Sequence, residues 1–142
     1  MKQKVLFICT HNSARSQMAE GYLRARYGGR YEAFSAGTEP APLNPYAIRV
    51  MQEVGIDISS HRSKPLKELY RQEMDFAVAV CDNSNQTCPF FPWAREMIHA
   101  GFPDPALFTG TDEEILAGFR KVRDEIFAWI DATFGSKEAG KH

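Results

Sequence analysis

The sequence predicts a three-layer α/β domain built around a parallel β-sheet. Strand-like apolar runs recur between segments whose apolar residues have helical spacing. Two of these runs, 5–9 and 75–81, are continuous rather than alternating, as expected of strands buried on both faces. The 142 residues are 44% hydrophobic and 25% charged, which suits one domain with a single core. We expect a single α/β domain over residues 1–135 and a flexible tail over 136–142.

The first half of the chain is expected to supply two strands and two helices. Residues 5–9 form the first strand, and the segment 16–27 has a helical pattern. A second strand is expected at 31–37, where Gly37 ends it. The next helix begins at Asn44-Pro45, an N-cap residue followed by proline at the first helical position. Its apolar face comprises Tyr46, Ala47, Val50, Met51 and Val54, and Gly55 suits its end.

The second half continues the alternation. Residues 75–81 predict a third buried strand, and 96–102 a weaker fourth. Thr111 and Glu114 have the spacing of a capping box, so a long helix is expected to start there. Its apolar face comprises Ile115, Phe119, Val122, Ile126 and Trp129 or Ile130.

Composition excludes several classes of function. The net charge is −1 and no run of Lys or Arg occurs, so we expect neither a nucleic-acid nor a membrane-surface partner. The opening apolar run, residues 5–8, is shorter than the ~7–15 residues of a secretory signal and the ~18–20 of a membrane span. A cytoplasmic location is therefore expected. Three cysteines are an odd number and do not indicate a disulfide framework.

The junction after the first strand is the first candidate site. Cys9 ends the strand, small polar residues follow, and Arg15 opens the helix. A loop of this kind aims consecutive backbone N–H groups at one point, so with Arg15 it can hold a tetrahedral oxyanion. The same field favours the thiolate form of Cys9. A C-x5-R spacing alone is weak evidence, and the alternative is a buried thiol beside a surface arginine.

Cys81 and Cys88 form the second candidate site. Cys81, like Cys9, ends a predicted strand, and ligands of parallel sheets gather at such ends. Six residues separate the two cysteines, so they are not a CxxC motif. In a helix the two thiols would lie ~10 Å apart, whereas a disulfide needs Cα atoms within ~7 Å. The intervening residues are poor helix formers, so we infer a redox-switched loop. The alternative is two inert cysteines.

The stretch CTHNSARSQMAEG resembles the phosphate loop of the low-molecular-weight protein tyrosine phosphatase superfamily, especially its thioredoxin-coupled arsenate reductases. The resemblance implies a four-stranded parallel sheet with helices on both faces. It also implies that Cys9 is the nucleophile, Arg15 the oxyanion clamp, and Asp104 the general acid. Cys81 and Cys88 would be the resolving cysteines. The residues implied to bind the oxyanion or support the loop are Thr10, His11, Asn12, Ser13, Ala14 and Ser16, with Asn12 holding the loop's shape and Ser16 bonding the thiolate.

Several positions depart from this pattern. His11 replaces a common glycine, which histidine can do because it tolerates positive φ, and Ala14 replaces a frequent cysteine. Tyrosines usual after the acid are absent, since Ala106, Leu107 and Phe108 follow Asp104-Pro105. Some relatives bind potassium behind the loop. Asn12, Glu20 and Ser35 match three ligands, but Lys64 takes the place of the aspartate. We expect the Lys64 ammonium to replace the ion and stabilise Glu20 directly, the alternative being a solvated surface lysine.

The resemblance therefore implies an arsenate reductase with a three-cysteine relay regenerated by thioredoxin. Phosphate and sulfate are expected to compete with arsenate, and weak phosphatase activity is expected. We expect a monomer that needs neither cofactor nor metal. Two alternatives stay open: a phosphomonoesterase that uses Cys9, Arg15 and Asp104, and a thiol sensor that binds an oxyanion. Asp104 could also be an ordinary loop residue before proline, and His61 and His99 receive no role.

Overall fold

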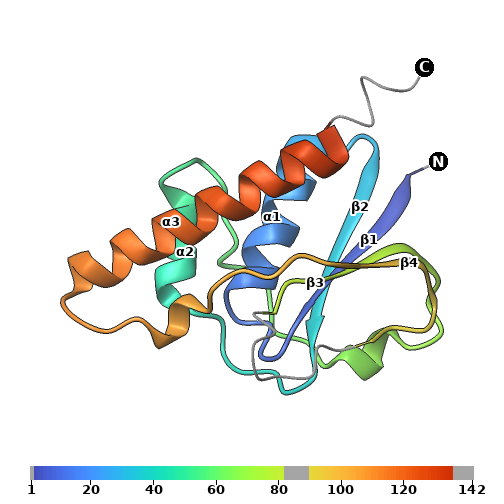
Figure 1. Ribbon diagram of the computed structural model, residues 1–142, viewed down its shortest axis with the longest axis horizontal. Helices are drawn as coiled ribbons and strands as arrows, with labels where there is room; N and C mark the ends of the chain where they lie inside the picture. The colour runs from blue at the N-terminus through green and yellow to red at the C-terminus, as the bar shows by residue number, and fades with distance from the viewer. Residues whose placement is uncertain (1, 82–89, 136–142) are drawn as a thin grey trace.

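A computed structural model describes residues 2–81 and 90–135 of the chain. Its four strands form one sheet in the order β2-β1-β3-β4, and all three strand pairs are parallel (Figure 1). The strands are β1 (Gln3–Cys9), β2 (Tyr31–Gly37), β3 (Met74–Ala79) and β4 (Ala94–His99). The predicted fold class, a three-layer α/β domain with a four-stranded parallel sheet and helices on both faces, is confirmed, and the helix on the second face is a short 3-10 helix.

Three α-helices cover one face of the sheet (Figure 1). They are α1 (Arg15–Tyr27), α2 (Pro45–Gln52) and α3 (Asp112–Ile130). Their buried side chains pack against strand residues that include Val5, Phe7 and Val78. The opposite face of the sheet has a thinner cover. There the 3-10 helix η1 (Leu66–Leu69) and the ring of Phe91 lie against Leu6, Ile8 and Ala77.

Local sequence explains where the helices begin. The side chain of Asn44 caps α2 by accepting a hydrogen bond from the Tyr46 amide at 2.8 Å. Thr111 and Glu114 exchange both hydrogen bonds of a capping box at the start of α3, as predicted. Apolar spacing then sets the buried face of α3. Its fully buried members include Phe119, Val122, Ile126 and Ile130, whereas Trp129 is half-buried.

The topology brings the candidate site residues at the ends of two strands to one edge of the sheet. β1 and β3 are adjacent and parallel, and their pairing extends past β3 because the Val80 amide donates to the Ile8 carbonyl at 2.9 Å. The carboxyl ends of both strands therefore meet beside the loop that leads from β1 into α1. The expected tail, 136–142, lies outside the described residues. In the part of the chain that is described, no helix is both long and apolar enough to cross a membrane.

Candidate active site

The loop between β1 and α1 turns its carbonyl groups outward. Four consecutive carbonyls, those of residues 10–13, accept hydrogen bonds from groups outside the loop. The donors are the amides of Glu39, Ala41 and Asn44 for Thr10, His11 and Ser13, and the side chains of Gln17 and Ser63 for Asn12. In a trans peptide the N–H points opposite to the carbonyl. The N–H groups of residues 11–14 are therefore turned toward the inside of the loop, as a cradle for a tetrahedral oxyanion requires.

Cys9 lies at the floor of this cradle with only 2% of its surface exposed. The Asn12 amide donates to its sulfur at 3.2 Å, and the Ser16 hydroxyl lies 3.0 Å away. The Ser16 oxygen accepts a hydrogen bond from the Asn12 side-chain amide at 2.8 Å, which leaves its own hydrogen free to point at the sulfur. Two hydrogen-bond donors, the Asn12 amide and the Ser16 hydroxyl, therefore converge on this sulfur.

Asn12 is the residue that bends the loop. Its φ is 51°, in the left-handed region that asparagine tolerates. His11, which stands where relatives commonly have glycine, does not use the positive φ that histidine tolerates. His11 keeps a negative φ and lies exposed, with Nδ1 2.9 Å from the Glu39 carbonyl. The Asn12 Oδ1 accepts from the Lys64 amide at 2.9 Å, and this unambiguous donor fixes Nδ2 as the group that faces Ser16.

Arg15 is buried and connects the loop to the neighbouring strand ends. Its Nη1 donates to the Phe102 carbonyl at 3.1 Å and, more weakly, to the Val80 carbonyl at 3.4 Å. Its Nη2 lies 3.5 Å from Oδ2 of Asp104. The structure thus brings the predicted clamp and the predicted acid together at the edge where Cys9 lies.

Asp104 begins the 3-10 helix η2 (Pro105–Leu107). Its Oδ1 accepts a hydrogen bond from the Ala106 amide at 3.0 Å, so the carboxyl group has one fixed oxygen and one that faces Arg15. Phe108, the aromatic residue after this turn, packs edge-on against Phe119 of α3 with ring centres 6.5 Å apart. Its partly buried ring thereby packs against the core.

Cys81 is buried two residues beyond the end of β3. It is disulfide-bonded, whereas Cys9 is a free thiol. Cys88 and the predicted redox-switched loop lie outside the described residues. The structure therefore places Cys9, Arg15, Cys81 and Asp104 at one edge of the sheet.

The family model for low molecular weight phosphotyrosine protein phosphatase matches residues 4–136. The chain belongs to this family. Among curated relatives, arsenate reductases from Halalkalibacterium halodurans and Bacillus subtilis are 45% and 43% identical to it. The two alignments cover 88% and 89% of this chain and 90% and 91% of the relatives.

Solved structures of the family are similar to the chain over nearly its whole length. One is described as an arsenate reductase in the phosphate binding state, with a TM-score of 0.80 and 30% identity. That match covers 94% of this chain and 98% of the other. A low molecular weight protein tyrosine phosphatase from T. tengcongensis has a TM-score of 0.76 and 28% identity. It matches 95% of this chain and 99% of its own.

In this family member, sequence reasoning missed three residues that hold the phosphate loop. Gly37 had been interpreted only as a strand end, but a Cβ there would lie 2.6 Å from the Thr10 carbonyl oxygen. Gln17 Nε2 lies 3.0 Å from both the carbonyl and Oδ1 of Asn12, and its Oε1 lies 2.9 Å from His61 Nδ1. Gly37 was visible in the sequence, and Gln17 lies only five residues after Asn12. The contact between Gln17 and His61 joins segments 44 residues apart and leaves no local signal.

His61 is held as a neutral ring. Its Nε2 lies 3.0 Å from the Arg24 guanidinium, which only donates, so the ring hydrogen is on Nδ1 and faces Gln17. The pKa of His61 lies below its ordinary 6.5, chiefly because burial disfavours the charged ring. Glu20 opposes this shift, while Arg24 and Lys64 reinforce it.

This environment predicts an acid-sensitive fold. Because folding lowers the pKa of His61, the unfolded chain binds a proton at this ring more readily than the folded protein does. Stability is therefore lost as the pH falls below 6.5. Replacing His61→Gln keeps a donor and an acceptor but removes the titration. The free energy of unfolding, measured with urea from about pH 7 to 5, should fall less steeply in the variant. An equal or steeper fall in the variant would contradict the assignment.

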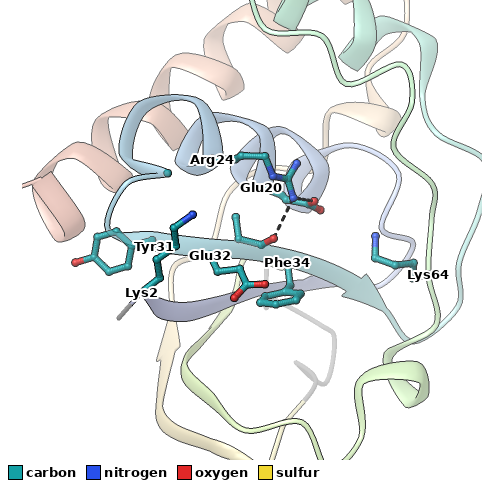
Figure 2. Close-up of a pocket in the computed structure, with 9 residues that line it drawn as sticks. Lys2, Glu20, Arg24, Tyr31, Glu32, Phe34 and Lys64 are labelled. Carbon is teal, nitrogen blue, oxygen red and sulfur yellow. Dashed lines mark hydrogen bonds and ion pairs between the residues drawn. The ribbon is translucent and has the colours of Figure 1, made fainter.

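The position behind the loop where relatives are expected to hold potassium is occupied by cationic side chains. Glu20 accepts a hydrogen bond from Ser35 and pairs with the Arg24 guanidinium, which also donates to the Ala33 carbonyl at 3.0 Å. Figure 2 shows Arg24 against Glu20, with Lys64 separated from both along the pocket. The Lys64 ammonium instead donates to the Arg62 carbonyl at 3.0 Å.

The expected direct contact between Lys64 and Glu20 is therefore wrong: Arg24 makes it. Burial lowers the pKa of Lys64, and the charge of Glu20 acts against that shift, so Lys64 contributes from a distance. Arg24 rather than Lys64 pairs with Glu20 because a planar guanidinium can donate to the Glu20 carboxylate and the Ala33 carbonyl at the same time. Because the Arg24 guanidinium pairs with Glu20 and Lys64 adds a second positive charge to the same pocket, the residues present do not fit a potassium ion.

We predict that potassium has no specific effect on the protein. Melting temperatures in potassium chloride and sodium chloride at equal ionic strength should coincide, because Arg24 already neutralises Glu20. The double variant Arg24→Ala, Lys64→Asp, which recreates the expected oxygen ligands, serves as the control and should be stabilised by potassium. A specific rise in the wild-type melting temperature with potassium would show that the arginine does not replace the ion.

Proposed function

We propose that the protein is an arsenate reductase that uses Cys9, Cys81 and Cys88 in a thiol relay regenerated by thioredoxin. The observation that carries the proposal is that Cys9 ends β1, while Cys81 lies two residues beyond the end of the adjacent parallel strand β3. Such strands lie ~4.8 Å apart, a spacing compatible with a disulfide between residues at their ends. The arsenate reductases among its relatives support the choice of substrate.

In the first step, the oxyanion lies among the N–H groups of residues 11–14 and the Arg15 guanidinium. The Cys9 thiolate attacks arsenic, and Asp104 gives a proton to the departing oxygen, which leaves as water. The carboxyl group of Asp104 is suited to this because one oxygen is fixed by the Ala106 amide and the other lies beside Arg15.

In the second step, the Cys81 thiolate attacks the Cys9 sulfur. The sulfur–arsenic bond breaks and its electron pair passes to arsenic, so arsenite leaves and a Cys9–Cys81 disulfide forms. Cys88 then attacks Cys81, which releases Cys9 as a thiolate. Thioredoxin reduces the resulting disulfide by supplying two electrons and two protons. A disulfide on Cys81 together with a free Cys9, as in this structure, is what the last state of this relay requires.

A phosphomonoesterase is the second candidate, because the matching family and the T. tengcongensis structure carry that description. Two observations make it the weaker one. Phe108 packs into the core against Phe119, and the adjacent Leu107 is 76% exposed, so the described turn offers a poor wall for an aromatic ester. A hydrolase also has no use for Cys81. We expect weak phosphatase activity, because both reactions begin with thiolate attack on an oxyanion.

The test is thioredoxin-dependent NADPH consumption by the reduced protein with thioredoxin reductase. Consumption should require arsenate and should be slowed by phosphate and sulfate as competitors. If the protein shows phosphatase activity but no arsenate-dependent consumption of NADPH, the proposed function is wrong and the protein is a phosphomonoesterase. Oxyanion binding without turnover of either substrate would indicate a thiol sensor.

A further inference from the structure

The hydrogen-bond ladder between β3 and β4 changes just before Cys81. It is regular as far as Ala79, whose carbonyl accepts from the Ala100 amide at 2.9 Å. A parallel ladder uses every second residue, so the Phe102 amide should next reach the Cys81 carbonyl. It donates to the Val80 carbonyl at 3.3 Å instead. The chain thus leaves the regular pleat at Val80, and the Phe102 amide does not reach the Cys81 carbonyl.

This departure matters for the direction of the Cys81 side chain. Cys9 packs with Val78 and Val80 on the helix-covered face of the sheet. Successive side chains of a strand point to opposite faces, so an uninterrupted pleat would turn Cys81 away from Cys9. A reaction between the two sulfurs therefore needs the backbone at Cys81 to be held outside the pleat.

His99, which ends β4, and Gly101, two residues further along the chain, provide that hold. The exposed ring of His99 donates from Nε2 to the Cys81 carbonyl at 3.1 Å, and Nε2 must carry the hydrogen because a carbonyl oxygen only accepts. Gly101 faces the same oxygen. A Cβ at Gly101 would lie 3.1 Å from it, tighter than ordinary contacts, so the absence of a side chain makes room for the turned carbonyl.

We propose that His99 is a positioning residue, which holds the Cys81 backbone so that its sulfur can reach Cys9. The proposal rests on the relay proposed above and adds a residue that touches neither oxyanion nor sulfur. His99 acts on the resolving cysteine alone. The phosphate loop and its bonds to Cys9 do not involve it.

The experiment measures how readily Cys9 and Cys81 pair when Cys88 cannot compete. Full-length protein carrying Cys88→Ser is equilibrated in buffers of glutathione and glutathione disulfide, which accepts the two electrons. The Cys9–Cys81 disulfide is quantified by alkylation and peptide mass spectrometry, which gives the effective concentration of the thiol pair. His99→Phe removes the donor, His99→Gln retains one, and Glu96→Gln on the exposed side of β4 is the matched control.

His99→Phe should lower the effective concentration about tenfold, since small displacements of reacting groups have effects of that order or larger. His99→Gln and Glu96→Gln should stay near the parent value. The alkylation rate of Cys9, which reports the phosphate loop, should be unchanged in all variants. The proposal would be overturned if His99→Phe kept the parent's effective concentration, or if His99→Phe and His99→Gln lowered it equally. Slower alkylation of Cys9 in a variant would also overturn it, as would a parent protein that forms no Cys9–Cys81 disulfide. Arsenate-dependent turnover is assayed separately, so failure of the reductase leaves this comparison intact.

Discussion

Replacing Arg15→Lys is expected to lower kcat/KM for arsenate by about a thousandfold, the upper range for losing one group that stabilises a developing charge. Arg15 begins α1 directly after the loop, and its guanidinium contacts two backbone carbonyls and lies beside Asp104. A lysine ammonium is a single point charge that cannot hold this arrangement and still bind two oxygens of a tetrahedral anion. Steady-state kinetics with arsenate as the varied substrate measures the loss.

The matched control is Arg49→Lys, because Arg49 is an exposed arginine on α2 and away from the loop. Its kinetics should match the wild type. The melting temperature of Arg15→Lys shows whether the variant is folded under assay conditions. Activity of folded Arg15→Lys within tenfold of the wild type would mean that the backbone N–H groups bind the oxyanion without a clamp.

Replacing Asp104→Asn is expected to lower kcat by about 10²–10⁴-fold, the usual contribution of a general acid. Asparagine has nearly the same shape, and its side-chain oxygen can still accept from the Ala106 amide, so the turn should persist. What it lacks is a transferable proton for the departing oxygen. The loss should therefore appear in kcat rather than in the binding of phosphate as a competitor.

The leaving group provides an internal control for this variant. Hydrolysis of phenyl phosphate needs a proton donor more than hydrolysis of p-nitrophenyl phosphate, whose leaving group is a weaker base. Asp104→Asn should therefore slow the first reaction much more than the second. Equal losses on both esters would assign Asp104 to positioning Arg15 rather than to proton transfer.

The sheet could be predicted from the sequence because its signals are local. Residues 31–37 form a strand with the predicted bounds, and Thr111 forms the predicted capping box. β1 begins two residues earlier than expected, at Gln3, and β3 ends at Ala79 rather than residue 81. This second difference has a physical cause, since the ladder turns at Val80.

Two details of the support around the site were not predicted, namely the residue that bends the loop and the partner of Glu20. Asn12 takes the left-handed conformation that the glycine pattern assigned to His11, since its side chain is held by the Lys64 amide, 52 residues away. Arg24 is favoured over Lys64 as the partner of Glu20 because it is one helical turn away on α1. The family resemblance implied the candidate site residues, including Asn12 and Ser16 beside Cys9. It did not indicate the contacts of Gln17, His61 and Arg24.

The most direct test of the relay is a single turnover of fully reduced protein carrying Cys88→Ser. Arsenate is added without thioredoxin, the reaction is quenched with acid, and arsenite and disulfides are measured by chromatography and peptide mass spectrometry. The relay predicts one arsenite per chain, a disulfide joining Cys9 to Cys81, and no further turnover. Release of arsenite without that disulfide, or repeated turnover of the variant, would contradict it.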